Sequence, residues 1–155
     1  LIQLEYHEFM FKSFLSAPNK KCWESQQFDQ WVLGCYPNGH TKSEQGNAMI
    51  YLKCVGLPPS IYGVKIRYTL FCPQTNLKWS YTQTYNYANT NYANATFKTS
   101  TLHSLKSLSF EITIHVLQLY DLNRKEVSSE HIRKYLKLPS PSLLEQPSSK
   151  TVDES

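Results

Sequence analysis

Apolar residues recur along much of this chain with a period of two, which is typical of β-strands that are buried on one face. The clearest case is the segment 64–70, where apolar residues alternate with mostly polar ones and predict a half-buried antiparallel strand. The segment 78–85 is its predicted hairpin partner, because a short turn containing Pro and Asn joins the two. Near-alternation at 4–14 and strict alternation at 110–119 predict two more strands.

Two further apolar runs are predicted to be buried strands. The first lies within the segment 28–39, contains Trp31, and ends at the sequence Pro-Asn-Gly at 37–39, whose residues favour a tight turn. The second covers 49–55 and follows Gly46. Because a polar loop joins the two runs, they predict a hairpin or a crossing between two sheets.

The segments between these strands have the composition of loops. The segment 16–27 contains Ala-Pro-Asn and predicts a loop. The segment 86–94 contains Asn-Tyr-Ala-Asn twice, and it also predicts a loop, because Asn side chains bond to the nearby backbone. Two interpretations of this second loop stay open. It is either a solvated low-complexity loop or a contact loop, in which Tyr gives contact area and Asn gives adaptable hydrogen bonds.

The C-terminal part of the chain lacks the strand pattern. Ser129 is suited to N-cap a helix with one apolar stripe, and Pro139 ends that helix. Beyond it, polar residues and Pro dominate, which predicts disorder because little can be buried. We therefore divide the chain into a β-sandwich at 1–124, a short helix at 125–138 and a disordered tail or linker at 139–155.

The composition favours an all-β protein, because the chain has 11 Tyr, 7 Phe and 3 Trp but only 5 Gly. Its 155 residues suffice for about one domain with a substantial core. The net charge of +4 is spread along the chain, which does not favour nucleic-acid binding. Neither a membrane span nor a secretion signal is recognisable. We therefore expect an intracellular protein of the cytoplasm, the nucleus or both and, since the chain begins at Leu1, a fragment of a longer protein.

Motifs for catalysis and metal binding are not found in the sequence. It contains no nucleophile elbow, Gly-rich phosphate loop, zinc-protease motif or defined pair of carboxylates. The cysteines are widely spaced, without His at ligand spacing, and are interpreted as reduced core thiols: Cys22, Cys35, Cys54 and Cys72. We therefore expect a protein that is not an enzyme and holds no metal or cofactor. Exposed strand edges and an aromatic loop favour a binding module.

Five residues of the segment 31–39 form the pattern Trp-x-Leu-x-x-Tyr-Pro-x-Gly: Trp31, Leu33, Tyr36, Pro37 and Gly39. This pattern resembles that of the MATH domain, also called the TRAF-C or meprin and TRAF homology domain. The segment 47–52 is similar to the strand that follows in the family, and the segments 9–14 and 110–116 resemble its first and last strands more loosely. The resemblance covers about residues 4 to 120 and is closest to the speckle-type POZ-like group of MATH-BTB proteins.

The resemblance implies an antiparallel β-sandwich of about eight strands that binds extended peptides along one sheet. Family positions that line the peptide groove fall on Tyr51, on Ile66 in place of an aromatic residue, and on either Tyr85 or Tyr87. A loop of the family groove falls on 90–94, of which three residues are candidates for peptide contact: Tyr92, Ala93 and Asn94. From the residues alone, alternatives stay open: Tyr51 can be an ordinary strand residue, Ile66 is better explained as a core residue, and Tyr92 can be a solvated loop tip.

The leading hypothesis is therefore a protein–protein interaction module for short peptide segments of partner proteins. By resemblance, it would be the substrate-recognition domain of a BTB/cullin-type ubiquitin ligase adaptor, with the cullin machinery bound through a domain outside this segment. One alternative is a TRAF-type signalling scaffold that acts as a homo-oligomer. A second is a structural assembly domain without a peptide groove.

Overall fold

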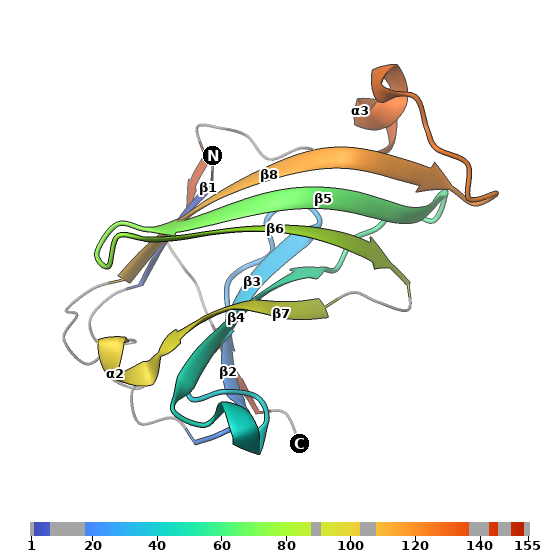
Figure 1. The fold of residues 1–155 in the computed structure, drawn as a ribbon. Coiled ribbons are helices and arrows are strands. Elements are labelled where there is room, and N and C mark those ends of the chain that lie inside the picture. The colour runs from blue at the N-terminus through green and yellow to red at the C-terminus, as the bar shows by residue number, and fades with distance from the viewer. Residues whose placement is uncertain are drawn as a thin grey trace.

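The alternating segments and apolar runs of the sequence contribute strands to two β-sheets that pack face to face in the computed structural model (Figure 1). One sheet, here called the β5 sheet, has the strand order β6-β5-β8-β1-β9. The other, the β4 sheet, has the order β10-β2-β3-β4-β7. The predicted all-β antiparallel sandwich is confirmed, with ten strands among the described residues. The structure describes residues 2–6, 18–87, 91–102, 108–136, 143–145 and 150–153.

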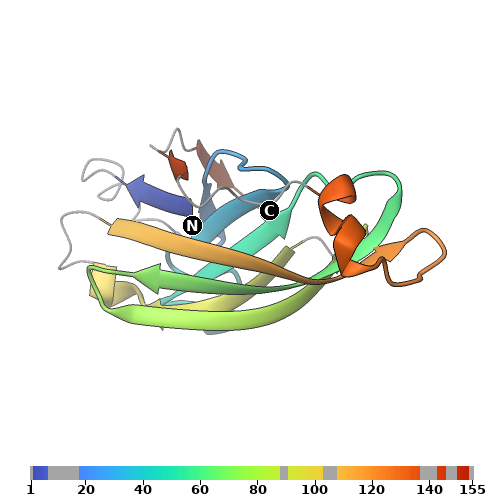
Figure 2. The same ribbon diagram turned by 90° about the horizontal axis from the view of Figure 1, so that it is seen from above.

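The two layers are visible in Figure 1 and, from above, in Figure 2. The strands of the β5 sheet are β1 (Ile2–Tyr6), β5 (Ile61–Cys72), β6 (Leu77–Asn86), β8 (Leu108–Asp121) and β9 (Leu143–Glu145). The strands of the β4 sheet are β2 (Lys21–Glu24), β3 (Trp31–Tyr36), β4 (Asn47–Cys54), β7 (Asn91–Lys98) and β10 (Lys150–Asp153). The described residues also form short helical segments, which are η1 (Lys42–Glu44), α2 (Thr99–Leu102), η2 (Ser129–His131) and α3 (Ile132–Tyr135).

β3 and β4 form the buried hairpin that the sequence predicts. They pair antiparallel, from Trp31 opposite Cys54 to Tyr36 opposite Met49. Every residue of β3 is buried, as expected for an apolar run without strict alternation. At the end of β3, Gly39 adopts a φ of +79°, and its amide donates a hydrogen bond to the Tyr36 carbonyl oxygen at 3.2 Å. Glycine adopts this conformation without steric cost, so the predicted tight turn is confirmed.

The alternating segment 64–70 lies in β5, at the middle of three long paired strands. β5 pairs with β6 on one side and with β8 on the other, which confirms the predicted strands at 78–85 and 110–119. The apolar residues on the inner face of β5 have no exposed surface: Val64, Ile66, Tyr68 and Leu70. The period-two pattern therefore indicates correctly which face of this strand meets the core.

Side chains of both sheets form one hydrophobic core. In this core the rings of Trp31 and Tyr85 lie edge to face, with their centroids 5.4 Å apart, which is a favourable geometry for aromatic pairs. The Tyr85 hydroxyl donates a hydrogen bond to the Leu52 carbonyl oxygen at 2.7 Å. Its polar atom is thus satisfied in the interior, so a tyrosine is tolerated there.

Two predicted loops contain strands in the structure. β2 lies inside the predicted loop 16–27 and pairs with β3, with Trp23 buried in the core. β7 begins at Asn91, inside the predicted loop 86–94, and pairs with β4; residues 88–90 lie outside the described part. The loop predictions are wrong for these strands because the edges of β3 and β4 supply backbone hydrogen bonds, and tertiary pairing overrides the local preference of Asn and Pro for loops.

Segments near both termini also pair with the sheets. β1 overlaps the predicted strand 4–14 and pairs antiparallel with β8; residues 7–14 lie outside the described part. Within 139–155, where the sequence predicts a disordered tail or linker, β9 pairs parallel with β1 and β10 pairs antiparallel with β2. These two strands contain Leu-Leu and Thr-Val, residues that favour strand formation where an open sheet edge is available.

Within 125–138, where the sequence predicts a helix, the structure has the short consecutive segments η2 and α3, with Ser128 as the N-cap in place of the predicted Ser129; residues 137–138 lie outside the described part. The apolar stripe of these segments packs on the sandwich, as expected for a helix too short to be stable alone. Leu136, immediately after α3, is only 3% exposed, and Ile132 is partly buried against the core. Among the described residues, none of the helices has the length and apolar character needed to cross a membrane.

Candidate functional site

The β4 sheet carries a second buried cluster on the face that points away from the core. Ile50 and Leu52 point into the core, so Tyr51 between them points outward, because side chains alternate along a strand. Tyr51 nevertheless has no exposed surface. It belongs to a separate group of buried residues, here called the outer cluster: Cys22, Tyr36, Met49 and Tyr51.

Polar contacts connect the outer cluster to the protein surface. The Tyr51 hydroxyl donates a hydrogen bond to Oε2 of Glu24 at 2.7 Å, and Sγ of Cys22 lies 3.6 Å from the hydroxyl oxygen. Nζ of Lys53 lies 3.7 Å from the same Glu24 oxygen. Glu24 is only 8% exposed, and a buried carboxylate is costly unless it is paired and hydrogen-bonded. Tyr51 and Lys53 thus hold Glu24 in place, and the Lys53 side chain is 37% exposed.

The outer cluster fixes the protonation state of Tyr51. Burial raises the pKa of the Tyr51 hydroxyl far above its ordinary value, and the hydrogen bonds to Glu24 and Cys22 raise this pKa further. At neutral pH the hydroxyl is therefore a permanent hydrogen-bond donor. A group that catalyses proton transfer needs a pKa near the working pH, so Tyr51 is not suited to general acid or base catalysis.

Gly34 provides the space that the Tyr51 ring occupies. The two residues are cross-strand neighbours in β3 and β4. A Cβ atom on Gly34 would overlap the Cζ and hydroxyl oxygen atoms of Tyr51. The glycine is therefore needed for the close approach of the ring and not for a left-handed backbone, because its φ is not positive.

A structured loop lies at one end of the outer cluster. The His40 ring stacks on Tyr36, with the centroids 4.6 Å apart. Oε1 of Glu44 accepts hydrogen bonds from the backbone amides of Thr41 at 2.8 Å and His40 at 3.2 Å. These bonds, that of Thr41 first, lower the pKa of the Glu44 carboxyl. The polar loop that joins β3 and β4 is thus ordered by a capping box around η1.

Two of the predicted peptide-binding residues lie in the core between the sheets. Ile66 is 0% exposed on the inner face of β5, and Tyr85 is 0% exposed beside Trp31. The structure therefore does not bring these two side chains to the outer face of the β4 sheet, where Tyr51 lies. Of the two positions that the sequence leaves open, Tyr87 is the surface residue: it is 60% exposed, and its hydroxyl donates to the Pro58 carbonyl oxygen at 3.1 Å.

The other three predicted residues, Tyr92, Ala93 and Asn94, lie in β7 and not in a loop. Ala93 pairs with Tyr51 and Tyr92 pairs with Leu52, and the register shifts between Ile50 and Tyr51. The backbone of β7 thus lies next to the outer cluster. The structure brings this segment, which the sequence predicts to be a loop, next to Tyr51 as a strand.

Sequence reasoning does not identify Glu24 and Lys53 as members of the site. Lys53 could have been identified from the sequence, because it lies two residues after Tyr51 in a predicted strand and therefore lies on the same face of that strand. Glu24 could not have been identified from the sequence. The segment 16–27 is predicted to be a loop, and the pairing of β2 with β3 depends on the tertiary fold.

The four cysteines are buried free thiols. Burial raises the pKa of Cys54 from an ordinary value of 9.0 to about 11. Burial, followed by the nearby Cys22, also raises the pKa of Cys35. In the described part of the chain, no group of three His, Cys, Asp or Glu side chains is placed to hold a metal ion.

From the raised pKa values of these thiols we expect the protein to lose stability at alkaline pH. A thiol whose pKa is raised by folding stabilises the protein below its ordinary pKa, and this contribution is lost as the pH rises from there toward the folded pKa. For Cys54 this range is from 9.0 to about 11. We expect the free energy of unfolding, measured by urea denaturation, to fall by about 1 kcal/mol per pH unit for such a group.

The Cys54→Ala variant should show a smaller slope over the same range. Tyr51→Phe should reduce the slope only above about pH 10, where an unfolded tyrosine ionises. Equal slopes in the wild-type chain and in Cys54→Ala would contradict the assignment to Cys54.

Comparison of the chain with protein-family models and with curated proteins finds no match.

Proposed function

We propose that this protein is a protein-interaction module that binds a short extended peptide segment as an added strand on β7. The observation that carries the proposal is the position of β7 at the end of the β4 sheet, where β4 is its paired neighbour among the described strands. An end strand has backbone N–H and C=O groups on its outer edge that another chain can pair with. Strand addition of this kind is a common mode of peptide recognition.

The surroundings of β7 support this proposal. Tyr87 precedes β7 in sequence and is 60% exposed, and its bond to Pro58 fixes the ring. A rigid, exposed tyrosine gives large contact area at low entropic cost. Lys53 pairs with Asn91 at one end of β7, and its contact with Glu24 places a partly exposed charge beside the strand. Such groups would select among peptide sequences, while the backbone of β7 supplies general affinity.

In this proposal Tyr51 supports the site and does not contact the peptide. Its side chain has no exposed surface, and its hydroxyl is bonded to Glu24. It holds β3 and β4 together through the close packing on Gly34 and positions Glu24 for Lys53. Loss of Tyr51 would therefore act through the shape of the sheet.

The resemblance of the Trp31 segment to MATH domains supports a more specific role. The bound segments would belong to substrates, and the module would recruit them to a BTB/cullin-type ubiquitin ligase. Affinity purification of the natural full-length protein from cells tests this role. Co-purification of a cullin supports it, and recovery of peptide-bearing partners without a cullin contradicts it.

The strand-addition proposal can be tested with peptides selected from a random display library on the 155-residue chain. Each backbone amide of a selected peptide is then N-methylated in turn, and the affinity is measured by fluorescence anisotropy. An added strand uses every second N–H for pairing, so the affinity should fall by about tenfold or more at alternate positions only. The backbone amide NMR signals of β7 should shift when the unmodified peptide binds.

Two variants with exposed side chains provide matched controls. Tyr87→Ala should weaken binding by about tenfold. Thr82→Ala, on β6 of the other sheet and equally outside the core, should leave the affinity unchanged. An N-methyl profile without alternation, or NMR shifts confined to the β5 sheet, would overturn the proposal.

A further inference from the structure

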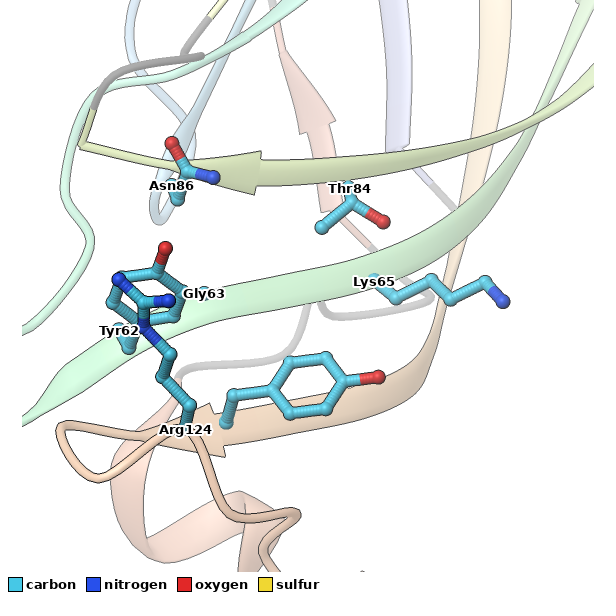
Figure 3. A pocket seen from close by; sticks show the side chains of 7 residues that line it. Tyr62, Gly63, Lys65, Thr84, Asn86 and Arg124 are labelled. Atoms are coloured by element: carbon cyan, nitrogen blue, oxygen red, sulfur yellow. The ribbon is translucent and has the colours of Figure 1, made fainter.

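The outer face of the β5 sheet has a hollow over Gly63, shown in Figure 3. Gly63 pairs with Asn86 of β6 and with Tyr120 of β8, so side chains stand on both sides of a position that has none. The hollow has a volume of about 360 Å³, which is within the usual size range of small-ligand sites. Its lining residues come from three adjacent strands and a turn: Tyr62, Gly63, Lys65, Thr84, Asn86, Tyr120 and Arg124.

The space over Gly63 is not filled by a neighbouring side chain. A Cβ atom there would meet the Tyr85 carbonyl oxygen at 3.2 Å and Cβ of Asn86 at 3.7 Å, which are tight but possible contacts. Its φ is not positive, so the backbone does not require glycine. This differs from Gly34, where the Tyr51 ring occupies the space. A glycine in a strand interior often marks the close approach of a ligand.

Arg124 is held at the edge of this hollow by an unusual backbone conformation. Its φ is +61°, in the left-handed region where glycine is favoured, and its amide donates to the Asp121 carbonyl oxygen at 2.9 Å. The guanidinium carbon lies 4.7 Å from the centre of the Tyr62 ring, and Figure 3 shows the Arg124 side chain beside this ring. The stacking leaves the N–H groups at the edge of the guanidinium plane for a ligand.

The charge of the hollow favours an anion. Lys65 is the second cation in its lining, and neither it nor Arg124 forms an ion pair with a described residue. The nearby Asp121 carboxylate accepts the backbone amides of Asn123 and Lys125 at 2.9 and 3.0 Å, so it is bonded within its own turn. Thr84 adds a hydroxyl that can donate a hydrogen bond. The residues that line the hollow include no acid.

We infer that this hollow binds a phosphoryl group carried on a side chain of a partner polypeptide. Arg124 would bind two phosphoryl oxygens through its planar fork. The Lys65 side chain points away from Arg124 in Figure 3, so it would add a second positive charge by changing its rotamer. The Tyr120 ring offers an apolar wall for the carbon atoms that carry the phosphoryl group, which a free phosphate ion would not use. The site lies on the β5 sheet, and β7 belongs to the other sheet, so the two proposals stand independently.

The test uses the 155-residue chain and NMR titration of backbone amides with defined probes. The probes are inorganic phosphate, a phosphotyrosine peptide, a phosphoserine peptide and the same two peptides without phosphate. We expect saturable shifts at Gly63 and Arg124 with at least one phosphopeptide. Its dissociation constant should be at least about tenfold lower than that of inorganic phosphate and of the matching unphosphorylated peptide.

Arg124→Gly provides a variant that separates binding from folding. Glycine fits the left-handed conformation at this turn, so the melting temperature should not fall substantially, while phosphopeptide affinity should fall by about tenfold or more. Lys78→Gln, which removes an exposed cation elsewhere on β6, should leave the affinity unchanged.

Three outcomes would overturn the inference. They are the absence of saturable shifts at Gly63 with every phosphorylated probe, unchanged affinity in folded Arg124→Gly, and equal affinity for inorganic phosphate and phosphopeptides. The last outcome would indicate an adventitious ion only.

Discussion

Replacing Gly34 by alanine is expected to lower the free energy of unfolding by about 3 kcal/mol, at the upper end of typical overpacking effects. The new Cβ atom would overlap the Tyr51 ring. The ring cannot move outward without breaking the hydrogen bond to Glu24, and it has no exposed surface that would indicate free space. Urea denaturation followed by circular dichroism measures the change.

Gly56→Ala is the matched control for this prediction. A Cβ atom at Gly56 would meet Gln27 and Gln30 atoms no closer than 3.5 Å, so its effect should stay within about 0.5 kcal/mol. The double variant Gly34→Ala, Tyr51→Ala should lose less stability than the sum of the two single variants, because the small side chain removes the overlap. Additive losses of stability would show that the Tyr51 ring is not what excludes a larger side chain at position 34.

Replacing Trp31 by alanine is expected to lower the free energy of unfolding by about 3–5 kcal/mol. The indole ring is 1% exposed, and it packs edge to face against the Tyr85 ring. Its removal leaves a cavity between the two sheets that the paired strands β3 and β4 cannot close. Since small domains have a total stability of about 5–15 kcal/mol, the variant should melt far below the wild-type chain or fail to fold.

Trp79→Ala distinguishes the loss of a core residue from the general loss of an indole ring. Trp79 lies on the end strand β6, is partly buried, and contacts the Phe97 ring at 5.9 Å between centroids. The Trp79→Ala variant should lose less than half as much stability as Trp31→Ala. Thermal melts followed by circular dichroism measure both losses without depending on indole fluorescence. Equal losses in the two variants would contradict the central position of Trp31 in the core.

The parts of the fold that depend on local sequence could be predicted. The turn at Gly39 and the burial of Ile66 follow from residue types and spacing within single strands. The strands β2 and β7 could not be predicted, because Asn91 and its neighbours form a strand only when β4 is beside them. Apolar periodicity reports which face of a strand is buried, but it does not report which other segments pair with it.

The candidate sites show the same division. The resemblance places Tyr51 and residues 92–94 at one groove, and in the structure the second segment is a strand that pairs with β4. The complete burial of Tyr51 depends on its packing over Gly34 in the neighbouring strand. The predicted groove position Tyr85 was placed by resemblance, and its hydroxyl is instead bonded to Leu52 inside the core. Arg124 gave no sequence signal, because its left-handed conformation and its stacking are properties of the folded turn.

The strand order of the β5 sheet has a consequence for synthesis on the ribosome. β8 lies between β5 and β1, and it pairs Leu4 near the N-terminus with Phe110. The hairpins β3–β4 and β5–β6 can form while the chain is still growing, because their partners are close in sequence. β1 cannot pair with β8 until β8 has left the exit tunnel. We therefore expect the nascent chain to keep β1 unpaired while residues 7–107 are made, and closure of the sandwich to be a late, non-local step.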